Sequence, residues 1–374
     1  MSQNKRPATL EHTIRPEIRS LPAYNAGLPE AFVMEKYGLS AVTRLASNEN
    51  PHGVSSKALS AAQRALPACW KYSDPDASTL RKSLSSHAHC PMDHIVVGNG
   101  SEEIIALICR LFLNPQDVVV TVDPSFILHE IYALEQGATV SSIKMTPEMQ
   151  FDEPALTASL RTSCRMLIFS NPSNPVGAML DQDGFDRMVR SLSADTVVVI
   201  DEAYYEYAVE TPGYPDSRRL LDDAGLPYII LRTFSKAYGL AGLRVGYALC
   251  ADAWIAQLLN KLRTPFNSNI VAQAAAVAAL EDGAFLETTI AHNRKERQRM
   301  RRVLTENGFR VADSAANFLF IDCAANSRSL AEHLLADGVI VKPWTTPGFE
   351  NWMRVTIGSE DDNDRFLSLF LKNR

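Results

Sequence analysis

The stretch 231–246, LRTFSKAYGLAGLRVG, contains the most reactive side chain that this sequence predicts, Lys236. It follows an apolar run typical of a buried strand. A lysine at such a place is poorly solvated, and poor solvation disfavours a charged ammonium relative to a neutral amine. A neutral lysine amine is a nucleophile that forms Schiff bases with aldehydes. Ser235 before it and Arg244 after it add two groups that suit a phosphate.

A carboxylate and a phenol follow another apolar run. Asp201 comes directly after VVVI, and Tyr204 lies shortly beyond it. A carboxylate at the rim of a buried sheet needs a cationic partner or hydrogen-bond donors. Asp201 would hold a proton on a heteroaromatic nitrogen, and Tyr204 would bond a ring hydroxyl. A helix N-cap at Asp201 is the structural alternative.

Two turns could bind anions or polar oxygens. GNGSEE (98–103) would direct the backbone N–H groups of Ser101 and Glu102 at an anion on a helix N-terminus. SNPSNPVG (170–177) places Asn171 and Asn174 between prolines, where a carboxamide can donate to a phenolate or carboxylate. The alternatives are a plain tight turn and ordinary Asn-Pro turns.

One arginine near the C-terminus suits a carboxylate. Arg354 lies in WMRVTIG, which predicts a strand. Its planar guanidinium would bind a carboxylate through two parallel hydrogen bonds. A surface ion pair is the alternative for this residue taken alone.

The elements that must position these groups alternate between short apolar runs and helical patterns. Runs of this kind lie within 94–100, 117–124, 165–172, 196–204, 228–235 and 245–250. Continuous apolar strands between helices predict a mostly parallel sheet covered on both faces. Ligands of such sheets bind at the carboxyl ends of the strands, where the polar groups above fall.

Three regions are predicted along the chain. Residues 1–45 are punctuated by proline and predict an N-terminal arm with a short helix, packing on the small domain or a partner subunit. Residues 46–270 form the large α/β domain. Residues 271–374 begin with long helical patterns and predict a connecting helix with a smaller α/β domain.

Composition excludes several classes of function. The chain has 374 residues, 46% of them hydrophobic, and a formal net charge of -6. This balance lacks the basic footprint of a nucleic-acid binder, and no apolar run is long enough to span a bilayer. The scattered cysteines predict neither a zinc site nor a disulfide framework, and no metal site is expected. A cytoplasmic enzyme of small molecules fits these features.

In succession, the motifs resemble the fold-type I pyridoxal-phosphate aminotransferases. More narrowly, LASNENPHG, GNGSEE, SNPSNPVG, DEAYYEY, TFSKAYGLAGLRVGY and MRVTIG are similar to the histidinol-phosphate aminotransferase family. The resemblance runs from about Tyr24 to the C-terminus. It implies the fold-type I architecture, a large domain with a mostly parallel sheet between helices and a smaller C-terminal α/β domain.

The resemblance also implies roles around pyridoxal 5'-phosphate. Lys236 would form the Schiff base with the cofactor and later shuttle a proton. Asp201 would keep the pyridine nitrogen protonated, which makes the ring an electron sink. Tyr204 and Asn174 would bond the ring O3′, and Phe126 would stack on the ring where the family usually has tyrosine.

The cofactor phosphate and the substrate would have separate ligands. The resemblance assigns the phosphate to Gly100, Ser101, Glu102 through its backbone, Ser235, Arg244 and Tyr72 of the partner subunit. It assigns the substrate to Arg354, Asn174, Tyr24 and Lys342. Lys342 replaces an arginine frequent in the family. The ammonium of a lysine is a point charge, and it is less selective for phosphate than the planar guanidinium of an arginine. Trp344 beside it adds an aromatic wall.

The expected activity is amino transfer between histidinol phosphate and 2-oxoglutarate, in histidine biosynthesis, by a cytoplasmic homodimer with shared active sites. The changes at Lys342 and Trp344 keep an aromatic amino acid aminotransferase open. A decarboxylase of a phosphorylated amino acid is a third possibility. A non-enzymatic binding module is disfavoured, because Lys236, Asp201 and Arg354 all remain.

Overall fold

The computed structural model describes residues 12–25 and 27–372, and its largest element is a seven-stranded sheet in the order β2-β8-β7-β6-β5-β3-β4. The strands are β2 (Ile95–Gly98), β3 (Val118–Asp123), β4 (Thr139–Lys144), β5 (Met166–Ser170), β6 (Val197–Asp201), β7 (Tyr228–Thr233) and β8 (Gly246–Cys250). β8 runs antiparallel to both of its neighbours, and the remaining pairs are parallel. The sheet is therefore mostly parallel, as the apolar runs predicted.

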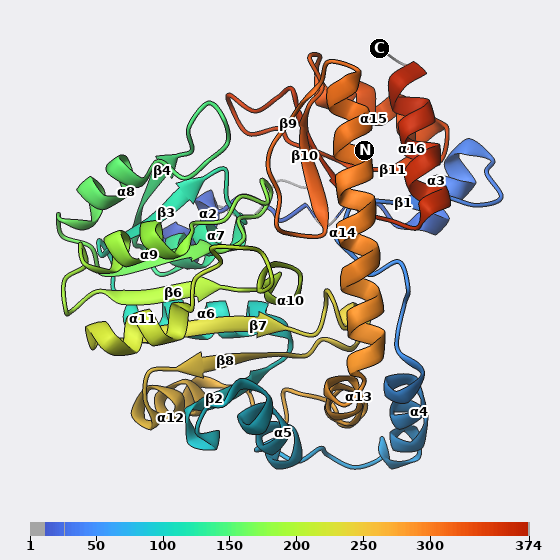
Figure 1. Ribbon diagram of the computed structural model, residues 1–374. Helices are drawn as coiled ribbons and strands as arrows, with labels where there is room; N and C mark the ends of the chain where they lie inside the picture. The colour runs from blue at the N-terminus through green and yellow to red at the C-terminus, as the bar shows by residue number, and fades with distance from the viewer. Residues whose placement is uncertain (1–11, 26, 373–374) are drawn as a thin grey trace.

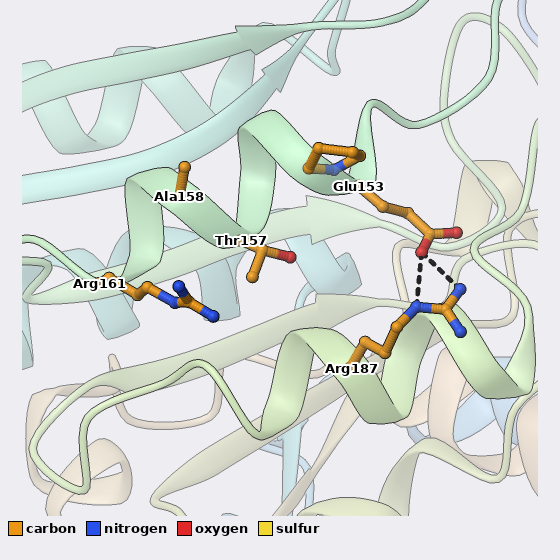
Figure 2. A pocket seen from close by; sticks show the side chains of 6 residues that line it. Glu153, Thr157, Ala158, Arg161 and Arg187 are labelled. Atoms are coloured by element: carbon orange, nitrogen blue, oxygen red, sulfur yellow. Dashed lines mark hydrogen bonds and ion pairs between the residues drawn. The ribbon is translucent and has the colours of Figure 1, made fainter.

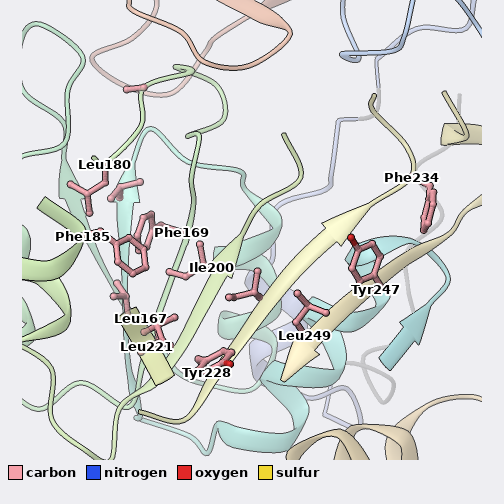
Figure 3. Close-up of a cluster of buried hydrophobic side chains, with 14 of the residues drawn as sticks. Leu167, Phe169, Leu180, Phe185, Ile200, Leu221, Tyr228, Phe234, Tyr247 and Leu249 are labelled. Carbon is pink, nitrogen blue, oxygen red and sulfur yellow. The ribbon is translucent and has the colours of Figure 1, made fainter. Parts of the chain in front are cut away.

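Both faces of this sheet are buried, which explains the continuous apolar strands. Successive side chains of a strand point to opposite faces. Leu167 and Phe169 of β5 pack in one core cluster, whereas Met166 and Ile168 pack in the other. Figure 3 shows the first cluster, where Phe169, Phe185 and Ile200 meet beside β6.

Helices cover both faces, and several of them begin at side-chain caps. They are α4 (Ser56–Ala65), α5 (Ser78–Ala88), α6 (Gly100–Phe112), α7 (Leu128–Glu135), α8 (Glu153–Leu160), α9 (Gln182–Val189), α10 (Tyr205–Ala208), α11 (Ser217–Ala224), α12 (Ala253–Leu262) and α13 (Ile270–Leu280), with 3₁₀ turns η1 (Leu66–Ala68), η2 (Met92–His94) and η3 (Ala241–Leu243). The side chains of Asp181, Asp216 and Asp252 accept hydrogen bonds from the first turns of α9, α11 and α12. These caps satisfy N–H groups that have no partner inside a helix.

The strand directions bring the polar loops to one edge. β2 is antiparallel to β8, and β8 is antiparallel to β7, so β2 and β7 run the same way. The carboxyl ends of β2, β3, β5, β6 and β7 therefore share one edge, the position at which such sheets bind ligands. Asp201 is the last residue of β6, and Lys236 follows β7 closely.

The C-terminal part builds a second layer of strands and helices. It comprises α14 (Gly283–Glu306), α15 (Ser327–Ala336), α16 (Glu360–Lys372) and the strands β9 (Arg310–Val311), β10 (Phe318–Asp322), β11 (Val339–Ile340), β12 (Lys342–Pro343) and β13 (Trp352–Thr356). Four of these strands form an antiparallel sheet in the order β12-β13-β10-β9. The long α14 runs from beside α13 to this small sheet, so one rigid helix joins the two parts (Figure 1).

The N-terminal segment contacts both parts of its own chain. α2 (Pro16–Ser20) packs on α7, and Arg15 Nη2 donates to the carbonyl of Glu135 at 2.5 Å. After α3 (Glu30–Tyr37), β1 (Thr43–Arg44) pairs in parallel with β11. The segment thus contacts the large domain through α2 and the small domain through β1, and residues 1–11 and 26 of the predicted 1–45 arm lie outside the described part.

The boundary of the two globular parts follows from how α13 packs. This helix contacts α4 and α5 and contributes Ala272 and Ala276 to the core cluster of the large sheet. We therefore propose a boundary between α13 and α14, later than the residue 270 expected from sequence. Within the described residues, no helix is both long and apolar enough to cross a membrane.

Candidate active site

Lys236 lies beyond the end of β7, at the shared edge of the strands. Its Nζ donates to the carbonyl of Ser47 at 2.8 Å and lies 5.9 Å from the centre of the Tyr204 ring. Burial and, to a lesser extent, the nearby cation Arg354 lower the pKa of Lys236 to about 8. Because this value is well below that of an ordinary lysine, the nucleophilic free amine is more populated near neutral pH than it is for an exposed lysine.

Asp201 is buried and held by side-chain and backbone donors. Its Oδ2 lies 3.2 Å from Nε2 of His129, a fully buried residue of α7. Its Oδ1 accepts from the backbone N–H of Ala203 at 3.1 Å. Nδ1 of His129 lies 3.5 Å from the hydroxyl of Ser125. Asp201 is therefore a supported carboxylate at the strand end, and it does not cap α10.

Tyr204 is buried, and its hydroxyl contacts the segment that follows β1. Asn48 Nδ2 donates to the Tyr204 hydroxyl at 2.8 Å. Asn48 in turn accepts from Thr356 Oγ1 at 3.1 Å, and its carbonyl accepts from Asn317 Nδ2 at 3.0 Å. Burial raises the pKa of Tyr204 to about 12, so the phenol stays protonated near neutral pH.

Arg354 and Asn174 meet across the two globular parts. Nη1 of Arg354, on β13, donates to Asn174 Oδ1 at 2.6 Å, and Nη2 donates to the carbonyl of Ala46. Nε of Arg354 is buried without a partner among the described residues. Burial lowers the pKa of Arg354, and the nearby Tyr204 opposes that shift. Arg354 is thus a buried guanidinium with an unused donor, and the surface ion pair is excluded. Asn171 has a structural task, because its side chain exchanges hydrogen bonds with the backbone of Leu180.

A small cradle surrounds the N-terminus of α6. Gly100 adopts φ +78°, and a Cβ there would lie 2.5 Å from Nη2 of Arg244. A Cβ on Gly246 would lie 2.4 Å from the backbone nitrogen of Ser101. A side chain on Gly246 would collide with the backbone of Gly100 and Ser101, and the positive φ of Gly100 is one that L side chains rarely adopt. Ser235 is buried, and its hydroxyl accepts from Thr233 Oγ1 at 3.0 Å.

Two aromatic residues of the predicted set lie in different surroundings. Phe126 is partly buried, and its ring meets His129 edge to face at 5.5 Å between centroids. Tyr72 lies between η1 and α5, with 79% of its surface exposed, and stacks on Phe266 at 4.4 Å. Phe126 is thus joined to the group around Asp201, whereas Tyr72 lies on an exposed surface.

The arm and the small domain bring two further predicted residues to the site. Lys342 Nζ donates to the carbonyl of Asn25 at 2.9 Å, and Lys342 lies opposite Arg354 in the register of β12 and β13. Burial and Arg354 lower the pKa of Lys342. Tyr24 is 52% exposed, and its pKa is raised by partial burial although Arg354 and Arg244 oppose the rise. Both residues therefore lie within the electrostatic range of Arg354.

Sequence reasoning missed three contributors. Ser47 and Asn48 lie in LASNENPHG, which resembled the family but carried no assigned role, although a polar SNEN run between structured segments was a usable signal. His129 lies inside a helical pattern, where a histidine on an apolar face usually belongs to the core. Its contact with Asp201 depends on the packing of α7 against β6, and spacing along the chain does not reveal that.

A surface hollow between α8 and α9 lies apart from these residues. It has a volume of about 320 Å³ and is lined by Glu153, Pro154, Thr157, Ala158, Arg161 and Arg187. Figure 2 shows Arg187 paired with Glu153 across it, at 2.6 Å between Nη2 and Oε2. We assign it no role, because this ion pair neutralises its nearest charges. Among residues 12–25 and 27–372, no group of three or more His, Cys, Asp or Glu side chains could hold a metal ion.

Comparison with known proteins gives a consistent result along the whole chain. The model of the family "Aminotransferase class I and II" matches residues 40–370. Histidinol-phosphate aminotransferase 3 of Rhizobium meliloti (strain 1021) is 43% identical over 358 residues, 95% of each chain. The histidinol-phosphate aminotransferase of Bacillus subtilis (strain 168) is 35% identical over 356 residues, 95% of this chain and 98% of that one.

Solved structures agree with these relatives. The crystal structure of histidinol-phosphate aminotransferase from Sinorhizobium meliloti in complex with pyridoxal-5'-phosphate matches with a TM-score of 0.87, at 27% identity over 96% of each chain. The aspartate aminotransferase from Thermus thermophilus with maleate gives a TM-score of 0.80 at 21% identity, over 96% of this chain and 99% of that one. The second likeness concerns the fold alone.

Proposed function

The chain belongs to the aminotransferase class I and II family, and on that premise we propose that it transfers an amino group from histidinol phosphate to 2-oxoglutarate with pyridoxal 5'-phosphate as cofactor. One observation supports this most strongly. A lysine amine with a pKa of about 8 lies 5.9 Å from the centre of the buried Tyr204 ring and within electrostatic range of the buried Asp201 and Arg354. The curated relatives named histidinol-phosphate aminotransferase support the choice of amino donor.

The residues present fit the cofactor. Arg244 and the backbone N–H of Ser101 both lie at the N-terminus of α6, beside Gly100 and Gly246 respectively. A helix N-terminus and a guanidinium together suit a phosphate. Asp201, supported by His129, suits the protonated ring nitrogen. When bound, pyridoxal phosphate supplies an electron sink for the negative charge that develops at the substrate α-carbon.

The residues around Lys236 would control the orientation and the protonation state of its amine. Lys236 would hold the cofactor through its free amine, and its Nζ would carry the proton that leaves the substrate α-carbon. The carbonyl of Ser47 accepts a hydrogen bond from Nζ at 2.8 Å and thereby orients the amine. A base with a pKa near the working pH is the efficient kind for such proton transfer.

Tyr204 and Asn174 would orient the ring oxygen and the substrate. The Tyr204 hydroxyl is fixed by Asn48 and stays protonated, so it can donate to an oxyanion. Asn174 receives its hydrogen bond from Arg354 through Oδ1, which leaves its Nδ2 group to donate. The edge-to-face contact of Phe126 with His129 would place the Phe126 ring for stacking.

Substrate selection would rest on Arg354 together with Lys342 and Tyr24. Arg354 is buried and holds one unused donor, which suits the carboxylate of an amino or keto acid. Lys342 keeps two N–H groups beyond the one bound to Asn25, and these suit an anionic substrate end. The half-exposed Tyr24 would close over the substrate from the arm.

An aromatic amino acid aminotransferase is the second candidate, and one feature favours it. The Lys342 ammonium is already engaged by the arm, and Trp344 next to it holds an indole N–H that is buried without a partner in the described structure. A single ammonium beside an indole selects a phosphate less strictly than a guanidinium fork would.

We further propose a homodimer with shared active sites. The surface around α4 and η1 exposes Leu59, Leu66, Trp70 and Tyr72, with 49%, 56%, 84% and 79% of each residue accessible. Exposed aromatic and aliphatic residues grouped on one face mark interaction surfaces. Tyr72 of one subunit would reach the cofactor phosphate of the other. A cytoplasmic location and the absence of nucleic-acid partners belong to the same proposal.

A substrate comparison tests the function. The value of kcat/KM is measured for histidinol phosphate and for phenylalanine, each with 2-oxoglutarate as acceptor. We expect a clear preference for histidinol phosphate. A preference for phenylalanine would replace the first function by the second, and an absence of amino transfer from either would refute both.

A further inference from the structure

We propose that the Glu102 side chain is an internal counter-anion of Arg244 that competes with the cofactor phosphate and so weakens cofactor binding. The proposal rests on the proposed function, in which the backbone at Glu102 and the side chain of Arg244 hold that phosphate. It adds an opposing role for the carboxylate. The predicted consequence is an exchangeable cofactor whose affinity is set partly by one acidic side chain.

Glu102 is anchored so that its charge faces Arg244. Its Oε2 lies 3.5 Å from Nη2 of Arg244, and its Oε1 accepts from the Tyr132 hydroxyl at 3.1 Å. Burial and this carboxylate together raise the pKa of Tyr132, so the phenol stays a donor. With both oxygens engaged, the carboxylate has a defined position between α7 and the cradle.

Arg244 is also fixed, and it points at the first turn of α6. Its residue adopts φ +56°, and Nη1 donates to the carbonyl of Ala241 at 3.3 Å. Its guanidinium occupies the space beside Gly100 where a Cβ would otherwise lie. The phosphate and the Glu102 carboxylate would therefore share one guanidinium, and neither anion could pair with it without facing the other.

The sign of the effect separates this proposal from a supporting role. Like charges that share a site repel, and the repulsion grows as water is excluded. Glu102 and Arg244 are 44% and 43% exposed, so solvent reduces the repulsion but does not remove it. If Glu102 competes with phosphate, its removal tightens cofactor binding. If it only positions Arg244, its removal weakens binding.

The neighbouring residue provides a matched control. Glu103 also lies in the first turn of α6, and its Oε2 accepts from the backbone N–H of Asn99 at 2.7 Å and from Asn267 Nδ2 at 2.5 Å. It has the same charge and lies one residue further into the same turn. Its carboxylate is directed to these two donors, whereas that of Glu102 is directed to Arg244.

The test measures binding rather than turnover. Dissociation constants of Glu102→Gln, Glu103→Gln and the unaltered protein are measured by equilibrium dialysis with pyridoxal phosphate, with pyridoxal and with inorganic phosphate. We expect Glu102→Gln to bind pyridoxal phosphate about tenfold more tightly, with pyridoxal unchanged and the gain reduced at high salt. Glu103→Gln should show no gain.

Unchanged or weaker binding of the phosphate-bearing ligand to Glu102→Gln overturns the inference. If that variant does not fold, Glu102→Asp withdraws the carboxylate by one methylene and should give a smaller gain in affinity. In the unaltered protein, ³¹P NMR should also show the bound phosphate losing its last proton at a higher pH than in the variant. An unaltered protein that binds phosphate but not pyridoxal phosphate contradicts the proposed function, and inorganic phosphate still decides the role of Glu102.

Discussion

The two sides of the candidate active site are built differently. At the edge of the large sheet, the polar groups are buried and held by side chains of other elements, as in the contacts of Asp201 with His129 and of Tyr204 with Asn48. On the side of the arm and the small domain, Lys342 is held by a single backbone carbonyl, and Tyr24 is half exposed. We call the first the fixed side, because its groups are buried and hydrogen-bonded. We call the second the adaptable side, because it depends on one exposed hydrogen bond.

This difference separates chemistry from selection. Groups that stabilise charge during a reaction act best when they are preorganised and need no rearrangement. A substrate must enter and leave, so the elements that enclose it belong to the less stable part of a structure. Arg354 joins both sides, because it is buried on β13 yet bonded to Asn174 of the large domain. The proposed catalytic residues should therefore tolerate change poorly, and the arm contacts should tolerate it better.

The largest expected effect belongs to the fixed side. Lys236→Met removes the proposed nucleophile and proton carrier, so amino transfer should fall by on the order of 10³-fold or more. Single-turnover kinetics with 2-oxoglutarate as acceptor measure the loss, and circular dichroism checks the fold. A variant that keeps a tenth of the activity would show that another group performs this chemistry.

The residue that joins both sides should give the next largest effect. Arg354→Lys keeps the charge but loses the planar guanidinium that would bind a carboxylate through two hydrogen bonds. The value of kcat/KM for 2-oxoglutarate should therefore fall roughly 10- to 100-fold, as expected for loss of a charged hydrogen bond. The half-reaction with histidinol phosphate, which lacks a carboxylate, should change much less. Equal losses in the two half-reactions would place Arg354 outside carboxylate recognition.

His129 tests whether the fixed side depends on residues that contact Asp201 from α7. His129→Asn removes a buried partner of Asp201 and should weaken cofactor binding about tenfold. It should also shift the pH at which the absorbance of the bound cofactor changes. Ser125→Ala, which alters only the outer contact of His129, should have a smaller effect. An unchanged absorbance titration in His129→Asn would show that the contact of His129 with Asp201 does not affect the protonation of the bound cofactor.

The lowered pKa of Lys236 predicts a pH-dependent stability difference without cofactor. The pKa is about 8 in the folded protein and 10.5 ordinarily, so between these values the unfolded chain binds more protons and stability rises with pH. Below pH 8 the buried charge costs about 1–3 kcal/mol, and Lys236→Met should be more stable by that amount. Thermal melts from pH 7 to 10.5 should show this advantage disappearing. A constant difference would show that Lys236 is not strained by burial.

The smallest effect is expected on the adaptable side. Lys342→Met removes the contact with Asn25, so KM for histidinol phosphate should rise several-fold while kcat changes little. Limited proteolysis should also cleave the arm near residue 25 faster, and Lys342→Arg should restore both properties. A loss in kcat alone would move Lys342 to the chemical side of the comparison.

Sequence reasoning was most successful for the fixed side. The apolar runs before Asp201 and Lys236 predicted their strands, and the expected fold class is confirmed by the sheet and by the solved relatives. A strand end specifies where a side chain lies in such a sheet, because the strands are parallel and end at one edge. The roles of Lys236, Asp201 and Arg354 stay predictions until the variants are measured.

The remaining contacts depend on long-range packing. Asn48 reaches Tyr204 only because the segment after β1 passes beside the residues that follow β6 and β7, and Lys342 reaches Asn25 only because the arm crosses to β12. Neither contact leaves a periodic signal in the chain. The antiparallel direction of β8 was equally hidden, because a fully buried strand is apolar whichever way it runs.

The central claim is that Lys236 is the residue that binds the cofactor aldehyde covalently. The unaltered protein is loaded with pyridoxal phosphate, reduced with borohydride, digested and mapped by mass spectrometry. We expect a single pyridoxyl group on Lys236. A modification on any other lysine, or none after saturation with the cofactor, would contradict it.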